Sequence, residues 1–307
     1  MVFLNDTFVP AADARIPVGD RGFLFADGVY EVMRVYGGRP VLFDAHVERL
    51  RRGLGELAIA WDGAARLEDI ARRLLEENAL DDDDATVYVQ VTRGAPEKRS
   101  HAFTAGVSPT VYVAVQPYPR HPAARYEEGV AAILVDDMRW KRRDIKSIAL
   151  LPNVLANQRA HDAGAFEALF VENGNVLEGS HSNLFVVRDG VARTHPLTPE
   201  ILRGVTRSVV LDLAREAGVE VREEPIPRAD LAAASELFLT GTTTEVMPVT
   251  RLDGERVGSG RPGPVARALQ SAYLERVGVA TAQAPDVGAP PLEHSDGARH
   301  QRGAAES

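Results

Sequence analysis

Lys146 is the residue whose surroundings most directly suggest chemistry. It lies in RRDIKSIALLPNVLANQRA, residues 142–160, where small and apolar residues surround it in a chain that otherwise prefers arginine. Burial among apolar groups favours the neutral amine, and a neutral amine can attack a carbonyl to form a Schiff base. The competing interpretation is a surface lysine near a turn. On the first interpretation, we expect a buried amine that bonds covalently to a carbonyl compound.

A carboxylate further along the chain suits an aromatic cofactor. Glu178 ends an expected strand in VLEGSHSNLF, residues 176–185, and small polar residues follow it. A carboxylate in such a place is usually a turn residue. One aimed at a pyridine nitrogen would keep that nitrogen protonated and strengthen an electron sink.

Two segments have the composition of an anion-binding cup. In LRGVTRSVV, residues 202–210, a glycine, a valine and a threonine stand directly before an expected helix, where free N–H groups and the helix dipole favour a phosphate. TGTTTE follows an expected strand and offers hydroxyls and backbone donors. Their candidate residues are Gly204, Val205, Thr206, Gly241, Thr242 and Thr243. Arg49, on a helix in the other half of the chain, could add a bidentate contact. Plain caps and turns, and an arginine facing solvent, are the alternatives.

The elements that would hold these side chains follow from hydrophobic periodicity and turn signals. Strands are expected at 2–9 as a hairpin, 29–36, 40–43, 86–92, 110–115, 130–135, 167–171, 176–177, 184–187 and 237–240. Helices are expected from about 45, with Asp44 as the N-cap, and at 67–78, 153–162, 207–217 and 264–277. Residues 93–108 form a long loop, and loops of that length are usually functional or mobile.

Proline and polar residues divide the chain into two domains. The pattern of residues 116–124, QPYPRHPAA, is typical of a linker. It predicts a small α+β domain at 1–117, a linker at 118–125 and a larger cofactor-binding domain at 126–279. Bulky apolar residues nearly vanish from 280 to 307, so this tail is expected to be disordered.

Composition excludes several classes of protein. Hydrophobic residues make up 45% and charged residues 26%, as in ordinary globular proteins. A net charge of −9 argues against nucleic-acid binding, and the only basic cluster, residues 139–143, is followed by acidic residues. With no cysteine and no regular histidine spacing, no metal site is expected. Without a signal peptide or a long apolar run, the sequence predicts a cytoplasmic protein that does not bind membranes.

Taken in order, DIKSIALLPNVLANQRA, EGSHSNLF, ILRGVT and TGTTTE resemble the motifs of the fold-type IV pyridoxal-phosphate enzymes, over about residues 1–278. The resemblance implies a two-domain α+β and α/β fold whose larger domain holds a pseudo-barrel of strands. It also joins the three signals, because pyridoxal 5'-phosphate needs a Schiff-base lysine, a partner for its pyridine nitrogen and a phosphate cup.

The resemblance implies a role for each matched residue. Lys146 would be catalytic and hold the cofactor, Glu178 would bind the pyridine nitrogen, and Leu202 would pack on the ring. The phosphate would be bound by residues of the cup and the helix arginine, namely Arg49, Gly204, Val205, Thr206, Gly241 and Thr242. Substrate would be bound by Tyr30, Arg99, His101, Ser180, His181 and Thr243. Arg99 and His101 would come from the partner subunit of a homodimer.

Within this family, RGFLFADGVYEVMRVYGG, residues 21–38, most resembles the D-amino-acid aminotransferases. That implies transfer of nitrogen from a D-amino acid to a 2-oxo acid in two half-reactions, with Lys146 moving the proton. The loop VTRGAPEKRSHAF keeps an Arg-x-His pattern but is about one residue longer than usual, which would widen substrate scope. A branched-chain aminotransferase, an (R)-amine transaminase, an aminodeoxychorismate lyase and a cofactor-binding protein without turnover are the alternatives.

Overall fold

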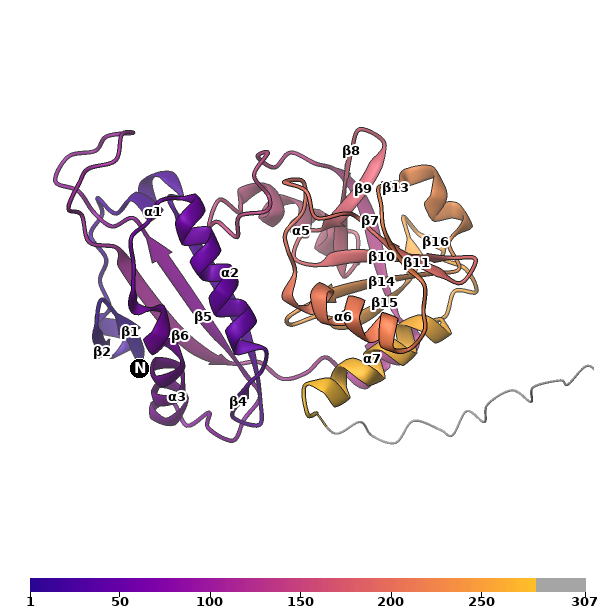
Figure 1. Ribbon diagram of the computed structural model, residues 1–307, viewed down its shortest axis with the longest axis horizontal. Coiled ribbons are helices and arrows are strands. Elements are labelled where there is room, and N and C mark those ends of the chain that lie inside the picture. The colour runs from indigo at the N-terminus through magenta and orange to yellow at the C-terminus, as the bar shows by residue number, and fades with distance from the viewer. Residues whose placement is uncertain (280–307) are drawn as a thin grey trace, which may run out of the picture.

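The computed structural model of the protein describes residues 1–279, which form two lobes side by side (Figure 1). The predicted disordered tail at 280–307 lies outside the described residues. The chain crosses from the smaller to the larger lobe after residue 117, where the last strand of the smaller lobe ends. The predicted domain limits of 117 and 126 stay a prediction.

Within the described residues, the smaller lobe holds an antiparallel sheet of six strands in the order β2-β1-β6-β5-β3-β4. The strands are β1 (Val2–Leu4), β2 (Thr7–Val9), β3 (Gly28–Tyr36), β4 (Arg39–Pro40), β5 (Ala85–Thr92) and β6 (Thr110–Pro117). The helices are α1 (Arg21–Phe25), α2 (Phe43–Glu56) and α3 (Leu67–Glu77), with short 3-10 turns at Ala11–Asp13 and Gly63–Arg66.

Alternation along the strands builds the core of this lobe. Every second residue of β5 is buried, with Val87, Val89 and Val91 at most 1% exposed, because successive side chains of a strand point to opposite faces. Apolar residues of α2 and α3, among them Leu50 and Leu74, pack in the same cluster. In Figure 1, α2 runs along the side of the sheet that faces the larger lobe, so its outer residues reach the space between the lobes.

The larger lobe is built on a mixed sheet that closes on itself. Its strands are β7 (Val130–Asp136), β8 (Glu167–Glu172), β9 (Asn175–Gly179), β10 (Asn183–Arg188), β11 (Val191–Thr194), β12 (Val221–Glu223), β13 (Ile226–Pro227), β14 (Glu236–Gly241), β15 (Glu245–Leu252) and β16 (Glu255–Arg256). Strands β10, β14, β15, β7, β8 and β9 follow one another, and β9 pairs back to β10 through Glu178 and Asn183. This closure confirms the predicted pseudo-barrel.

Helices cover the outside of the barrel: α4 (Ala123–Glu128), α5 (Leu151–Asp162), α6 (Val205–Glu216) and α7 (Pro264–Arg276), with a 3-10 turn at Arg228–Ala233. The alternation of β10 separates two cores. Leu184 belongs to one apolar cluster with strands of the barrel, whereas Phe185 stacks on Phe238 in the cluster that includes α6 and α7. No helix within residues 1–279 has the length and apolarity to cross a bilayer, and the cytoplasmic location stays a prediction.

Four predicted boundaries are wrong by a few residues. The expected strand at 40–43 ends at Pro40, and α2 begins at Phe43. Leu42, in the left-handed region at φ 54°, is the N-cap, so Asp44 lies in the first turn and does not cap. Helix α5 begins at Leu151 because a proline in the first turn gives up only an N–H that has no partner there. Helix α6 begins at Val205, two residues before the expected start.

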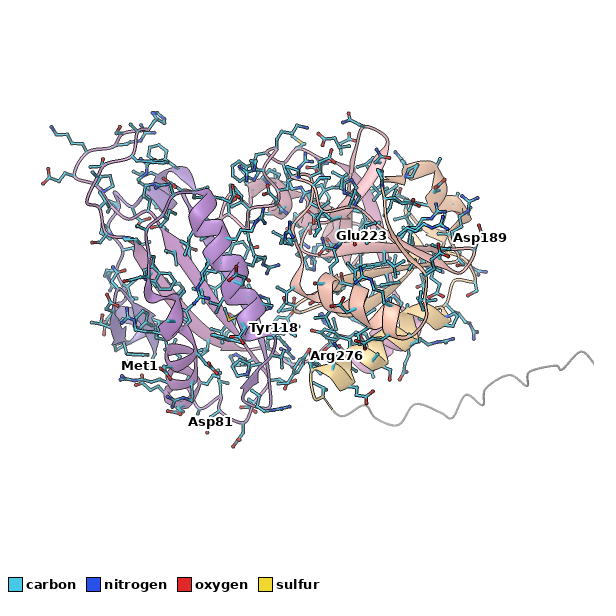
Figure 2. The ribbon with its side chains drawn as sticks, in the orientation of Figure 1. Met1, Asp81, Tyr118, Asp189, Glu223 and Arg276 are labelled. Atoms are coloured by element: carbon cyan, nitrogen blue, oxygen red, sulfur yellow. The ribbon has the colours of Figure 1, made fainter. Side chains whose placement is uncertain are left out.

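A buried carboxylate ties the two lobes together. Glu245, at the start of β15, is 2% exposed and accepts hydrogen bonds from the Tyr36 hydroxyl at 2.7 Å and from Arg120 Nε and Nη2, both at 2.9 Å. Gln270 of α7 donates at 2.7 Å. Tyr36 ends β3 of the smaller lobe, and Arg120 follows Tyr118 in the crossing segment, which Figure 2 shows between the lobes. Burial opposes ionisation, but Arg120 and Tyr36 more than offset it and lower the pKa of Glu245.

Replacement of this carboxylate should destabilise the protein. We expect Glu245→Ala to lower the free energy of unfolding by about 3–5 kcal/mol, because the change leaves the Arg120 guanidinium without its buried partner. Since the pKa of Glu245 is lowered from 4.5, this stabilisation is complete above that value and is lost as pH falls through the lowered pKa. Urea unfolding at neutral and acidic pH measures both effects. Glu255→Ala, at an exposed position of β16, is the control; an equal loss in both variants would contradict the assignment.

Candidate active site

A cleft of about 1020 Å³, including its open mouth, contains most of the predicted site residues. Thirteen of the fifteen line it, namely Tyr30, Arg49, Lys146, Glu178, Ser180, His181, Leu202, Gly204, Val205, Thr206, Gly241, Thr242 and Thr243. They come from β3 and α2 of the smaller lobe and from loops and strand ends of the larger one. The structure therefore brings together residues that are up to about two hundred positions apart in the chain.

Lys146 lies in the loop between β7 and α5, and its backbone is pinned to the other lobe. The Tyr30 N–H donates to the Lys146 carbonyl at 3.0 Å, and Ile148 donates to the Gly28 carbonyl at 3.1 Å. The Lys146 Nζ lies 4.2 Å from the centroid of the Tyr30 ring. Two short backbone contacts thus hold the amine at the boundary of both lobes.

The surroundings of this lysine differ from the expectation. Lys146 is half-buried rather than buried, since its side chain opens into the cleft. Among the flanking apolar residues, Ile145 is buried, but Leu151 is 69% exposed on the first turn of α5. The apolar run therefore does not enclose the amine. An aromatic ring on one side and a polar cleft on the other surround it instead.

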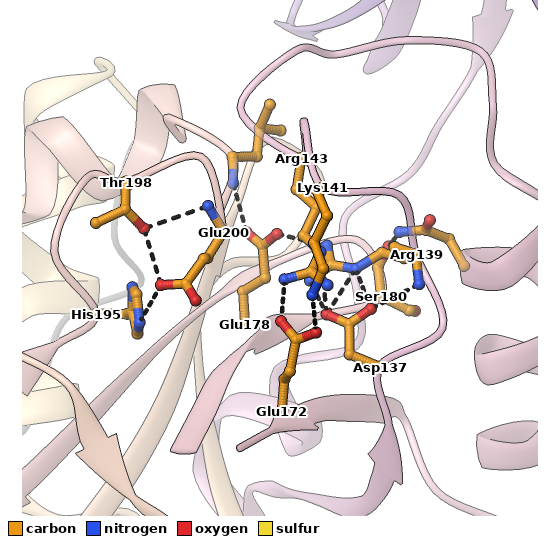
Figure 3. A network of polar contacts seen from close by, with 12 residues as sticks. Asp137, Arg139, Lys141, Arg143, Glu172, Glu178, Ser180, His195, Thr198 and Glu200 are labelled. Carbon is orange, nitrogen blue, oxygen red and sulfur yellow. Dashed lines mark hydrogen bonds and ion pairs between the residues drawn. The ribbon is translucent and has the colours of Figure 1, made fainter. Parts of the chain in front are cut away.

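Glu178, near the end of β9, is buried and accepts three hydrogen bonds. Its Oε2 accepts from the Leu202 N–H and from Asn183 Nδ2, both at 3.0 Å, and its Oε1 accepts from Arg139 Nη1 at 2.6 Å. Figure 3 shows Arg139 between Glu178 and Asp137. Burial raises the pKa of Glu178, and the guanidinium of Arg139 acts in the opposite direction. The carboxylate is thus aimed by three donors on the wall of the cleft.

The basic cluster at 139–143 anchors this part of the site, a role that sequence reasoning missed. Arg139 also contacts Asp137 at 2.7 Å. Arg143, with a side chain 1% exposed, pairs with Glu172 at 2.8 Å and lies 3.4 Å from Asp137. Arg143 and Lys141 lower the pKa of Glu172 to about 2, and Figure 3 shows this network below Glu178. Acidic partners thus compensate the two buried arginines of the cluster, Arg139 and Arg143, whereas Lys141 is exposed.

The N-terminus of α6 has the unmet donors of an anion site. Gly204 is the N-cap without a side-chain cap, and the first backbone bond of the helix runs from the Ser208 N–H to the Gly204 carbonyl. The first N–H groups of any helix have no partner within it. The hydroxyls of Thr206 and Thr240, both buried and both on the cleft, make no hydrogen bond within residues 1–279. Such groups fit a bound phosphate, which accepts several hydrogen bonds at once.

Gly204 is required by close packing at this cup. A Cβ atom at position 204 would lie 1.9 Å from Asn183 Oδ1, so any other residue would displace the amide that binds Glu178. Gly241 ends β14 opposite the cup, and the turn that follows it presents Thr242 and Thr243 to the cleft. The second half of the predicted cup is therefore adjacent to the first.

Arg49 reaches the cleft from α2 in a fixed orientation. Its Nε and Nη2 donate to the two oxygens of Glu31 at 2.7 and 2.8 Å, and its Nη1 donates to the Arg203 carbonyl at 3.1 Å, across the lobes. His46 Nδ1 lies 2.8 Å from Glu31. Although burial acts against ionisation, Arg49 and His46 lower the pKa of Glu31 to about 2. A buried anion thus holds the arginine beside the residues that precede α6.

Glu31 was missed, although the sequence holds a signal for it. Alternate residues of β3 point into the core, and Val29, Met33 and Val35 are at most 1% exposed. Glu31 occupies the position between Val29 and Met33 and is itself 0% exposed. A carboxylate on the apolar face of a strand needs a buried partner, and the helix arginine provides it.

Arg99 and His101 do not reach this cleft. Both are exposed in the loop between β5 and β6, which Figure 1 shows at the far end of the smaller lobe. Arg99 lies 4.5 Å from the centroid of the Phe25 ring, and the His101 ring lies 5.3 Å from it. Arg21 binds the backbone of this loop through the carbonyl of His101 at 3.2 Å. Within one chain, the predicted carboxylate-binding pair is remote from Lys146.

Comparison of the sequence with known proteins finds aminotransferases. The amino-transferase class IV family model matches residues 28–252. A D-alanine aminotransferase of Bacillus licheniformis is 40% identical over 278 residues, which cover 90% of this chain and 96% of that protein. A D-alanine aminotransferase of Staphylococcus aureus is 38% identical over 274 residues, with 89% and 96% covered.

Solved structures with the same fold are also aminotransferases. The branched-chain amino acid aminotransferase of Escherichia coli matches with a TM-score of 0.82 at 29% identity, over 90% of this chain and 94% of that one. The branched-chain amino acid aminotransferase of T.th., in a structure with pyridoxamine 5'-phosphate, matches with a TM-score of 0.81 at 29% identity, over 90% and 93%.

Proposed function

The chain belongs to the amino-transferase class IV family, and on that premise we propose that it transfers the amino group of a D-amino acid to a 2-oxo acid in two half-reactions. The resemblance to fold-type IV enzymes, the aminotransferase activity and the cofactor pyridoxal phosphate are thereby confirmed. The convergence of Lys146, Glu178 and the donors before α6 on one cleft carries the proposal. The D-configuration is supported by relatives named D-alanine aminotransferases.

The donor set of the cleft fits this cofactor. When bound, pyridoxal phosphate supplies an aldehyde that exchanges amino groups and a protonated ring that withdraws electrons from the reacting carbon. Glu178, held by Arg139, would face the pyridine nitrogen, and its carboxylate would keep that nitrogen protonated. Leu202 would pack on the ring, and the cup of Gly204, Val205, Thr206, Gly241 and Thr242, with Arg49, would bind the phosphate.

Lys146 is the group that would move the proton. Its Nζ points into the cleft beside Tyr30, so a substrate with its α-carbon near this amine can lose a proton to it and later regain one at the neighbouring carbon. An amine held at the reacting atoms acts as base and acid in turn. The anchored backbone limits its travel, and this orientation favours transfer on one face of the substrate.

The substrate side of the cleft is lined by Tyr30, Ser180, His181 and Thr243. We infer that Arg99 and His101 reach it from a second copy of the chain in a homodimer. Apolar side chains are exposed at both places that such a dimer would join. Phe23 and Phe103 are 71% and 62% exposed beside the Arg99 loop, and Val154 is 58% exposed on α5 near the mouth of the cleft. Exposed apolar groups that gather in patches are typical of interfaces.

A half-reaction scan tests the proposed activity. The absorbance of the bound cofactor is followed after addition of D-alanine, L-alanine, D-glutamate, L-leucine or (R)-phenylethylamine, without any oxo acid. We expect conversion to the amine form with the D-amino acids, at rates at least about tenfold above those with the L-enantiomers, since a tenfold ratio needs only about 1.4 kcal/mol of discrimination.

Other outcomes of the scan identify the alternatives. Fastest conversion by L-leucine would assign the chain to the branched-chain enzymes, the group of the solved neighbours. Conversion by the (R)-amine alone would indicate an amine transaminase. No conversion by any donor would contradict transamination altogether.

Complementation tests whether Arg99 acts across a dimer. Lys146→Ala and Arg99→Ala chains are expressed together and compared with each variant alone. If each site combines Lys146 of one chain with Arg99 of its partner, a mixed dimer has one intact site of two. Random pairing then restores about a quarter of the wild-type activity, as expected for two-fold symmetry.

Lys146→Ala with Glu178→Ala is the matched control, because both residues line the cleft of the same chain and no mixed site would be intact. If the Lys146→Ala and Arg99→Ala chains expressed together are no more active than the mean of the two variants alone, Arg99 does not complete the site of the partner chain. The aminotransferase assignment would still stand.

A further inference from the structure

Glu167 is a buried carboxylate that the reaction described above does not use. It begins β8, is 0% exposed, and lies behind the turn that joins β9 to β10. It accepts hydrogen bonds from Ser180 Oγ at 2.6 Å, from the Ser180 N–H at 3.0 Å and from Ser182 Oγ at 2.7 Å. Gly179 is required here, since a Cβ at that position would lie 2.6 Å from Glu167 Oε2. The carboxylate thus fixes the turn that lines the cleft.

His181 is the ionic partner of this carboxylate. Its Nδ1 lies 3.0 Å from Glu167 Oε2 and 3.2 Å from Ser180 Oγ. The imidazole is 41% exposed, whereas the carboxylate has no exposure. The ring packs against Phe166, with 6.0 Å between centroids. Glu167 and Ser180 therefore contact Nδ1, whereas Nε2 makes no hydrogen bond or ion pair within residues 1–279.

The arginines on the wall of the cleft are already paired with carboxylates of the protein. Arg49 pairs with Glu31, Arg139 with Asp137 and Glu178, and Arg143 with Glu172. Their side chains are at most 8% exposed. Lys146 is reserved for proton transfer. Among the described residues of the lining, His181 is the remaining cationic group, and it is open to the contents of the cleft.

We propose that His181 determines substrate specificity: with Nδ1 held by Glu167, its Nε2–H donates to the second carboxylate of a dicarboxylic substrate, an acidic amino acid or the corresponding 2-oxo diacid. This inference rests on the proposed function and names the residue of that same site that would recognise a second carboxylate. A charged donor favours a carboxylate over the methyl group of a small substrate, because charge-assisted hydrogen bonds are the stronger ones.

The charges around the imidazole give this contact a pH dependence. Burial acts against the imidazolium, but Glu167 more than offsets it and raises the pKa of His181, while the Lys146 ammonium opposes the charge. His121 packs edge-on against the same Phe166 ring, and its own pKa is lowered by burial, by Arg125 and by His181. His181 is thus protonated below its raised pKa and loses its charge as pH rises through it.

The test compares D-glutamate with D-alanine as donors of the holoenzyme, through the ratio of their kcat/KM values. Asparagine at position 181 can keep a contact to Glu167 but lacks the second nitrogen. We expect His181→Asn to lower the ratio about 10- to 100-fold, the range of one charge-assisted hydrogen bond. In the wild type the ratio should fall as pH rises through the pKa of His181, whereas in the variant it should be independent of pH.

Two further variants complete the design. In Glu167→Gln, the ratio of kcat/KM for D-glutamate to that for D-alanine should fall at a lower pH than in the wild type. The reason is that the negative charge of Glu167, which raises the pKa of His181, is gone. His161→Asn changes an 81% exposed histidine of α5 and should leave both ratio and profile unaltered. A decrease of less than tenfold in His181→Asn, or a pH-dependent ratio that survives the change, would overturn the inference. If no donor converts the cofactor in the wild type, the proposed function fails instead.

Discussion

Charges placed between two lobes must be paired, and this constraint organises the whole molecule. A carboxylate or guanidinium taken out of water costs several kcal/mol unless a partner compensates it. Each wall of the cleft accordingly carries one buried acid with its own cation: Glu31 with Arg49, Glu178 with Arg139, and Glu167 with His181. Glu245 with Arg120 connects the lobes by the same principle. The pairs fix the aim of side chains that would otherwise sample many rotamers.

The division of labour in the cleft follows from these pairs. The donors that stay unmet are the hydroxyls of Thr206 and Thr240 and the first N–H groups of α6, so an anion is favoured at that end. Glu178 is the acid that faces the middle of the cleft, and Lys146 is the amine held at the boundary of both lobes by hydrogen bonds to β3. A cofactor with a phosphate, a basic ring nitrogen and an aldehyde satisfies the three places at once.

Short sequence motifs predicted much of this site, whereas contacts between residues that are distant in the sequence were not predicted. Gly204 precedes an apolar helix and Gly241 follows a strand, so neighbouring residues were enough to single them out. The structure puts both on the cleft. Arg139 and Glu167 could not be singled out in this way. Glu178, the partner of Arg139, is 39 residues away, and His181, the partner of Glu167, is 14 residues away. The exposure of Lys146 was misjudged for the same reason: flanking residues such as Leu151 turn outward on α5. The closure of β9 on β10 decides these neighbours, and periodicity cannot reveal it.

Locating the covalent attachment of the cofactor tests most directly whether Lys146 is the amine that holds it. The chain holds three lysines, Lys98, Lys141 and Lys146, so reduction of the holoenzyme with borohydride followed by peptide mass spectrometry can assign the modified one without ambiguity. We expect the reduced cofactor on Lys146 and none on Lys141, whose ammonium pairs with Glu172. Label on Lys98 or Lys141, or a Lys146→Ala variant labelled as fully as the wild type, would contradict it.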